Sequence, residues 1–155
     1  MRELTPDTSL GFEAIEFSEN ILGRPLFPWQ KWLFVHSLEL APGSFTYDKF
    51  PKLRFDTVIV EVARQQGKSY WLSTRALWRM FMWEHPSGDP PLVLGTAHKE
   101  TAAQEIKDLA SRAVKDSPEL VDELLHNYTN NGNNYLLLKN GARYRVEAAS
   151  DDGGF

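Results

Sequence analysis

Apolar positions recur at helical spacing in the first third of the chain. Between about residues 10 and 22 they fall three or four positions apart, until Gly23 interrupts the pattern. Pro28 stands where a proline opens a helix, and the apolar pattern continues from there toward Leu40. These patterns predict an N-terminal helical segment over residues 1–54.

The middle of the chain alternates between strand-like and helix-like patterns. Residues 55–62 are rich in β-branched side chains and predict a strand, and residues 68–84 contain neither Gly nor Pro and predict a helix. Residues 92–97 form a short apolar run that predicts a buried strand, and residues 99–113 place small and apolar side chains on one helical face. This alternation predicts an α/β sandwich with parallel core strands, over residues 55–155.

The last third predicts a helix, a loop and a hairpin. Residues 118–126 continue the helical pattern, and the asparagine-rich residues 130–134 indicate a loop. Asn140-Gly141 is the preferred pair of a type I′ turn. Residues 135–139 and 142–148 are therefore expected to pair as a β-hairpin.

Composition narrows the possible functions. The net charge of −4 and the pI of about 5.6 argue against a passive nucleic-acid coat, although a motor can touch DNA through a few loops. The absence of cysteine excludes disulfides and thiolate metal sites, and the four histidines lack a metal-ligand spacing. No apolar run is long enough to span a membrane, and no signal core is present, so a cytoplasmic protein is expected.

The strongest chemical signal is Ala63-Arg64-Gln65-Gln66-Gly67-Lys68-Ser69. It matches the end of the phosphate-binding pattern GxxxxGK[ST], with Val62 in place of the first glycine. Gly67 lets the backbone approach phosphates, Lys68 can reach the β- and γ-phosphates, and the Ser69 hydroxyl can ligate Mg²⁺. A Gly-Lys-Ser/Thr triplet occurs by chance in roughly one in ten chains of this length. Its position between a predicted strand and a predicted helix favours a phosphate-binding loop for ATP and Mg²⁺.

Arg64 lies inside this loop. Its cation could touch the γ-phosphate and stabilise the charge that develops there. A solvated arginine, or a local salt bridge to Glu61, explains the residue equally well.

The ordered set of motifs resembles the ATPase domain of the tailed-phage terminase large subunit. The resemblance covers about residues 20–155, and residues 75–81 look like versions from phages of actinobacteria. It rests on the following segments: Leu26-Phe27-Pro28-Trp29-Gln30, the arginine-bearing loop, Gly95-Thr96-Ala97 followed by Ala103-Gln104, the Asn-Gly hairpin, and Ala148-Ala149-Ser150. It implies a P-loop NTPase of the RecA/ASCE-like class, a three-layer α/β sandwich that is incomplete here.

The resemblance also implies roles for single residues. Gln30 would read adenine, because an amide can bond both N6 and N7 of that base, and Trp29 would lie near it. A plain core position explains the Trp29 ring better. Arg64 would sense the γ-phosphate in cis. Arg143 and Arg145 could serve a neighbouring subunit as a trans-acting finger, but exposed strand charges account for them more simply.

Two parts of the family's machinery are missing. No apolar strand ending in an acidic pair follows residue 149, and Asp151-Asp152 in a turn-like stretch is a poor substitute for Walker B. The C-terminal nuclease domain is also absent. The sequence is therefore expected to be a fragment with little ATP hydrolysis of its own.

The leading hypothesis is the N-terminal part of a DNA-packaging ATPase. By the resemblance, its partners would be double-stranded DNA, the portal protein, the small terminase subunit and further copies in a ring, in the host cytoplasm and transiently at the procapsid portal. A fragment of a superfamily 2 helicase-like ATPase also pairs a glutamine motif with such a loop. A non-catalytic nucleotide-binding remnant is the alternative from another class.

Overall fold

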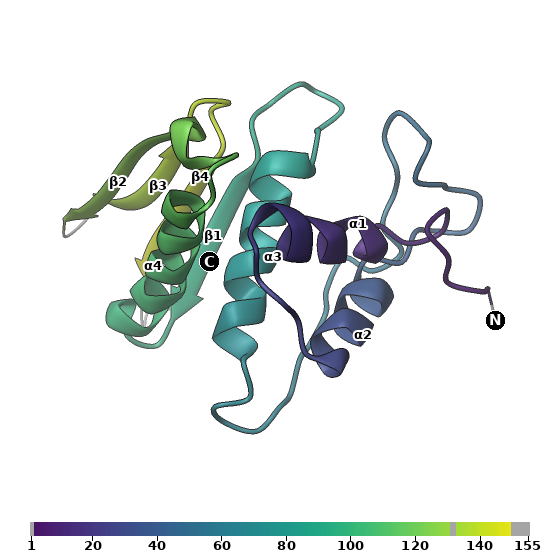
Figure 1. The fold of residues 1–155 in the computed structure, drawn as a ribbon, viewed down its shortest axis with the longest axis horizontal. Helices are drawn as coiled ribbons and strands as arrows, with labels where there is room; N and C mark the ends of the chain where they lie inside the picture. The colour runs from purple at the N-terminus through teal and green to yellow at the C-terminus, as the bar shows by residue number, and fades with distance from the viewer. Residues whose placement is uncertain (1, 131–132, 150–155) are drawn as a thin grey trace. The chain divides into compact units, whose positions relative to one another are not determined.

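The computed structural model describes residues 2–130 and 133–149. The chain forms two compact units, Met1–Gln66 and Gly67–Phe155. The first unit contains α1 (Gly11–Glu16), a π-helical turn (Phe17–Ile21) and α2 (Pro28–Ser37), as Figure 1 shows. Both helices predicted for the first third of the chain are confirmed. The first predicted helix is split between α1 and the π turn, and α2 ends three residues before the predicted Leu40.

α2 begins where the sequence predicts because Pro28 occupies its first turn. Phe27 precedes it with extended backbone, and the backbone N–H of Phe27 donates to Gln30 Oε1 at 2.8 Å. The side chain of Gln30 thus supplies the acceptor that the glutamine of a capping box provides.

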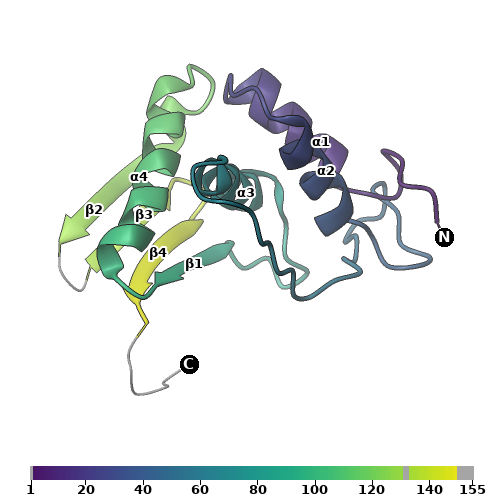
Figure 2. The ribbon, with the colours of Figure 1, turned by 90° about the horizontal axis from the view of Figure 1, so that it is seen from below.

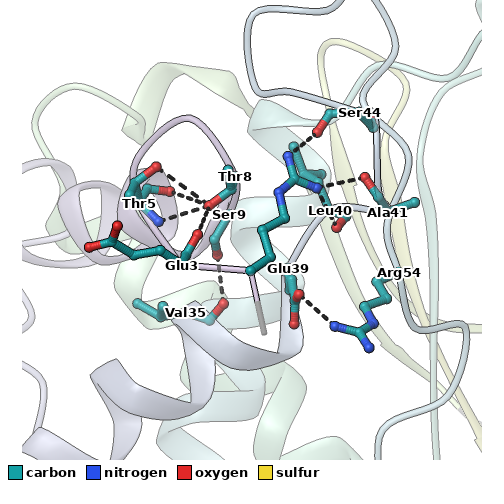
Figure 3. A network of polar contacts seen from close by, with 11 residues as sticks. Glu3, Thr5, Thr8, Ser9, Val35, Glu39, Leu40, Ala41, Ser44 and Arg54 are labelled. Carbon is teal, nitrogen blue, oxygen red and sulfur yellow. Dashed lines mark hydrogen bonds and ion pairs between the residues drawn. The ribbon is translucent and has the colours of Figure 1, made fainter.

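Polar contacts fix the extended segments around these helices (Figure 3). The guanidinium of Arg2 donates to the carbonyl oxygens of Ala41 and Ser44, both at 2.8 Å. Ser9 Oγ donates to Val35 O at 2.6 Å, and Arg54 pairs with Glu39 at 2.8 Å. These bonds join parts of the chain that lie more than 25 residues apart, except for the Arg54 pair. The bonds from Arg2 and Ser9 give these backbone carbonyl oxygens hydrogen-bond partners from distant side chains.

Residues 55–62 do not form the predicted strand. Within residues 2–130 and 133–149, no backbone hydrogen bond joins them to another strand, and Ile59 is 90% exposed. β-branched residues favour extended backbone, but a strand also needs a neighbour that supplies hydrogen bonds and cross-strand side chains. The prediction is wrong because composition does not supply that neighbour.

The second unit is a mixed α/β fold built on one four-stranded sheet. The sheet order is β1-β4-β3-β2, with β1 parallel to β4 and the other pairs antiparallel. The α/β class is confirmed, whereas the expectation of parallel core strands holds only for β1 and β4. The elements are α3 (Lys68–Met82), β1 (Leu92–Ala97), α4 (Glu100–Asp116), a 3₁₀ turn (Val121–Glu123), β2 (Leu124–Asn130), β3 (Asn133–Leu138) and β4 (Arg143–Ala148).

Three sequence-based assignments in this unit need correction. Residues 118–126 are not one helix, since only a 3₁₀ turn precedes β2, and Asn130, Asn133 and Asn134 belong to strands rather than to a loop. Alternation in β2 is weak, and its strand character comes from pairing with β3. β1 is half-exposed rather than buried, as only one of its faces is covered.

The predicted β3–β4 hairpin is confirmed, but its turn is not type I′. That turn needs positive φ at both central residues. Only Gly141 has positive φ, at 88°, while Asn140 does not. Gly141 N–H donates to Leu138 O, and Leu138 N–H donates to Ala142 O, both at 3.0 Å. The turn is therefore a three-residue loop closed by a left-handed glycine.

Helices α3 and α4 lie on one side of the sheet (Figure 2). The residues between sheet and helices include Leu136, Leu138 and Val146, all nearly inaccessible to solvent. Gly95 on β1 is required by this packing, because a Cβ there would lie 2.6 Å from Tyr144 Oη. That close approach gives a physical reason for the glycine in the Gly95-Thr96-Ala97 motif.

A buried lysine ties α4 to the sheet. Lys107 is fully buried, and its ammonium donates to Tyr128 O at 2.7 Å and to Asn134 Oδ1. Asn134 in turn donates to Gln104 Oε1 at 3.2 Å. Desolvation lowers the pKa of Lys107, and the nearby charge of Asp108 opposes that shift. Sequence periodicity does not indicate this position, because a lysine beside an apolar stripe is normally solvated.

Candidate functional site

The loop that precedes α3 has an unusual backbone. Gln65 adopts a left-handed conformation with φ 60°, and Gly67 does so with φ 90°. Gln66 between them has negative φ, so the handedness alternates along three residues. Alternation of this kind turns successive N–H groups toward one side and forms a concavity that suits an anion. For a glutamine this conformation costs on the order of 1–3 kcal/mol. Sequence reasoning assigned Gln65 to the loop but had no signal for its left-handed backbone.

The start of α3 adds to this arrangement. α3 begins at Lys68 with Gly67 as its N-cap, and no side chain caps it. The first turn contains no acidic residue. The backbone N–H groups of Lys68 and Ser69 donate to no acceptor among the described residues. Open N–H groups and the positive end of the helix dipole together favour a bound anion.

Two cationic residues belong to the same short stretch of sequence. Arg64 and Lys68 are both exposed, and neither forms an ion pair in the part of the chain that the structure describes. The salt bridge from Arg64 to Glu61 that could have explained this arginine is not formed. Ser69 is exposed one residue further along. The local sequence thus presents two cations, a hydroxyl and open amides within six residues.

Gln30 and Trp29 lie in the first turn of α2, within the unit Met1–Gln66. Gln30 is 1% exposed, and its Oε1 accepts from the Phe27 N–H. Trp29 is half-buried, between a core and a surface position. Contact of either residue with a nucleotide remains a prediction, and the Gln30 amide has a clear structural use in capping α2.

The remaining candidates fall into two groups. Arg143 and Arg145 are exposed on β4, as their simpler interpretation requires, and Arg145 pairs with Glu147 at 3.0 Å. Ser150 and Asp151-Asp152 lie outside the described residues.

Within the described ranges no cluster of three or more His, Asp or Glu side chains could hold a metal ion. No described helix has the length and apolar character needed to cross a membrane.

Comparison with known proteins rests on structure. The sequence matches no protein-family model and no curated protein. The fold is similar to the crystal structure of the HK97 bacteriophage large terminase, with a TM-score of 0.66 and 22% sequence identity. The match covers 95% of this chain and 29% of the terminase chain. The resemblance inferred from the motifs is thus supported by the fold, while the likeness to phages of actinobacteria stays a prediction. The chain shares its fold with part of a bacteriophage large terminase.

Proposed function

We propose that residues 64–69 bind the triphosphate of ATP together with Mg²⁺, and that the chain is the ATP-binding part of a DNA-packaging motor. The observation that carries this proposal is the backbone of the loop: left-handed Gln65 and Gly67 lead directly into an uncapped helix with a basic first turn. A backbone shaped this way in front of a lysine and a serine fits the chemistry of phosphate binding. The fold shared with a large terminase supports the motor assignment.

In this proposal the backbone groups and the side chains of the loop have separate roles. The backbone N–H groups of Gln65 and Gln66 line the concavity, and the backbone N–H groups at the start of α3 donate to the β-phosphate. The ammonium of Lys68 bonds the β- and γ-phosphates, and Ser69 Oγ ligates Mg²⁺. Arg64 contacts the γ-phosphate and stabilises the charge that develops on it during transfer.

Binding of ATP tests the loop directly. Titration with a fluorescent ATP analogue and Mg²⁺ should give saturable binding to the wild-type chain. Lys68→Ala should weaken binding by about 10-fold to 100-fold, because it removes a charged hydrogen-bond donor from the phosphates. Lys115→Ala is the matched control, since Lys115 is an exposed lysine at the end of α4. Unchanged affinity in a folded Lys68→Ala chain would contradict the proposal.

Recognition of adenine by Gln30 is a separable part of the proposal. Gln30→Ala also removes the acceptor for Phe27 N–H, so a loss of stability on the order of 1 kcal/mol is expected from capping alone. Loss of this capping bond alone cannot change the protein's preference between adenine and guanine nucleotides. The ratio of ATP to GTP affinity is therefore the informative quantity, and a ratio equal to that of the wild type would remove Gln30 from the nucleotide site.

The wider role follows from the terminase assignment. The motor would act on double-stranded DNA and would assemble with further copies in a ring, with the portal protein and the small terminase subunit as partners. A matched pair of DNA-translocation assays, with the wild type and with Lys68→Ala in the complete motor, tests this role. Translocation that persists in Lys68→Ala would contradict it.

A further inference from the structure

Among the described residues of the second unit, helices cover only one face of the sheet. Helices α3 and α4 lie on the same side (Figure 2), and Asn127 on β2 faces them through a 2.9 Å bond to Ser111. Residues that alternate with the buried ones point away from the helices. On β4 these are Arg143, Arg145 and Glu147, which alternate with the buried Tyr144 and Val146.

The strand register gathers aromatic and arginine side chains on the uncovered face. Tyr128 on β2 pairs with Tyr135 on β3, and Tyr135 pairs with Arg145 on β4. In the next row, His126 pairs with Leu137, and Leu137 with Arg143. We call His126, Tyr128, Tyr135, Arg143 and Arg145 the aromatic–arginine face.

Four of these side chains, all but Arg145, are in contact in a continuous series. The ring centroids of Tyr128 and Tyr135 lie 4.7 Å apart, and those of His126 and Tyr128 lie 5.2 Å apart. The guanidinium of Arg143 stands 5.0 Å from the centre of the Tyr135 ring. Planar groups in contact over three strands form an extended platform on which further planar groups can stack.

One of the two arginine charges on this face has no acidic partner among the described residues. Arg145 pairs with Glu147, but Arg143 is exposed and forms no ion pair with any residue the structure describes. A protein surface that covered the face permanently would have to desolvate this guanidinium, which is costly without a partner anion. Leu92 and Leu94, the exposed leucines of the edge strand β1, pair with Arg143 and Arg145, so β4 lies between them and the aromatic rings.

We propose that the aromatic–arginine face binds single-stranded nucleic acid. Aromatic rings supply stacking surfaces for bases, and arginines supply contacts for phosphates, which is the combination that such strands require. A duplex buries the faces of its bases in its own stack, so it cannot use the tyrosines in this way. This site is separate from the proposed ATP loop, because every residue of the face lies on β2, β3 or β4.

The test is fluorescence anisotropy of a labelled oligothymidine of about 20 nucleotides, a length that exceeds the usual site of one small module. The whole 155-residue chain is titrated at several salt concentrations. Abasic, duplex and RNA oligomers of equal length are the comparison probes. The proposal predicts that thymidine and RNA strands bind at least several-fold more tightly than the abasic strand or the duplex.

Variants locate the binding. Tyr128→Leu and Tyr135→Leu keep apolar volume on the strands and should each weaken binding about tenfold, within the range found for loss of one stacked base. Arg143→Gln should weaken binding and reduce the salt slope by about 0.7, the value for one phosphate contact on a single strand. Arg112→Gln, an exposed position on α4, makes the same charge change and should have no such effect.

Four outcomes would overturn the proposal. The first three are the absence of binding at low salt, equal binding of the abasic strand, and equal losses of affinity in Arg143→Gln and Arg112→Gln. The fourth is dimerisation through this face, in which sedimentation would show a dimer for the wild type and a folded monomer for the tyrosine variants. Lys68→Ala should retain strand binding, so failure of the ATP proposal and failure of this one are distinguishable. Circular dichroism verifies that each variant is folded.

Discussion

Residues 55–62 and β1 (Leu92–Ala97) have similar apolar sequences, yet only β1 is a strand. Each residue of β1 has a partner on β4, from Leu92 opposite Arg143 to Ala97 opposite Ala148. Residues 55–62 have no such partner among the residues described, and Ile59 is 90% exposed. Strand formation in this chain therefore depends on the neighbouring strand more than on intrinsic preference.

The same comparison bears on the proposed function. The proposed phosphate-binding loop, residues 64–69, follows directly on the unpaired segment, and α3 begins within it at Lys68. A loop that holds phosphates is normally fixed on both sides, by the strand before it and by the helix after it. In this chain the helical side is well ordered by packing, since Trp78 and Leu77 on α3 are buried.

The largest expected difference between the unpaired segment and the sheet is in the rate of amide hydrogen exchange. Amides of residues 57–62 should exchange at nearly unprotected rates, because they bond to no other described strand. Ladder amides of β4 should exchange roughly a thousandfold more slowly or better, since their exchange requires the sheet to open. Mass spectrometry of peptides from the two regions measures both. Strong protection over 57–62 would show that this segment is paired in solution.

The second expected difference is in how the free energy of unfolding depends on alkaline pH. Burial raises the pKa of Tyr144 to about 12, above the ordinary value of 10. Between pH 10 and 12 the unfolded chain loses this proton while the folded chain retains it, so the free energy of unfolding falls as pH rises. The loss from this group should approach roughly 2–3 kcal/mol at pH 12.

Tyrosine-to-phenylalanine variants isolate this effect in urea unfolding. Tyr144→Phe should lose the corresponding part of the alkaline decline. Tyr47→Phe, at a ring that is 71% exposed in the first unit, should keep the wild-type profile. Identical alkaline profiles for wild type and Tyr144→Phe would contradict the burial of Tyr144 against Gly95.

A matched pair of valine substitutions gives the smallest effect. Val146 on β4 is 4% exposed, whereas Val58 in the unpaired segment is 44% exposed. Val146→Thr places a hydroxyl in the core and should reduce the free energy of unfolding by about 1–3 kcal/mol. Val58→Thr should change it by less than about 0.5 kcal/mol. Comparable losses at both positions, measured by urea unfolding, would mean that residue 58 is packed.

Elements set by local chemistry could be predicted from the sequence. Pro28 fixed the start of α2, and Gly67-Lys68 fixed the start of α3. The bounds of β1 agree with the prediction, because turn-forming residues frame its apolar run. Each of these signals acts over a few residues, so the sequence contains it in full.

Features that depend on distant partners could not be predicted. β2 is a strand because β3 pairs with it, and Lys107 is buried because Tyr128 and Asn134 supply acceptors from the sheet. The aromatic–arginine face emerges only from the register of three strands. For the candidate site, the residue types of the loop were evident, but the left-handed backbone of Gln65 was not.

Hydrogen exchange of residues 64–70, measured with and without ATP and Mg²⁺, tests whether this loop holds the phosphates. We predict that nucleotide slows exchange at the amides of the loop and of the first turn of α3, because phosphate oxygens accept their hydrogen bonds. The slowing should disappear in Lys68→Ala and persist in Lys115→Ala. Binding of ATP that protects another region and leaves residues 64–70 unchanged would contradict phosphate binding by this loop.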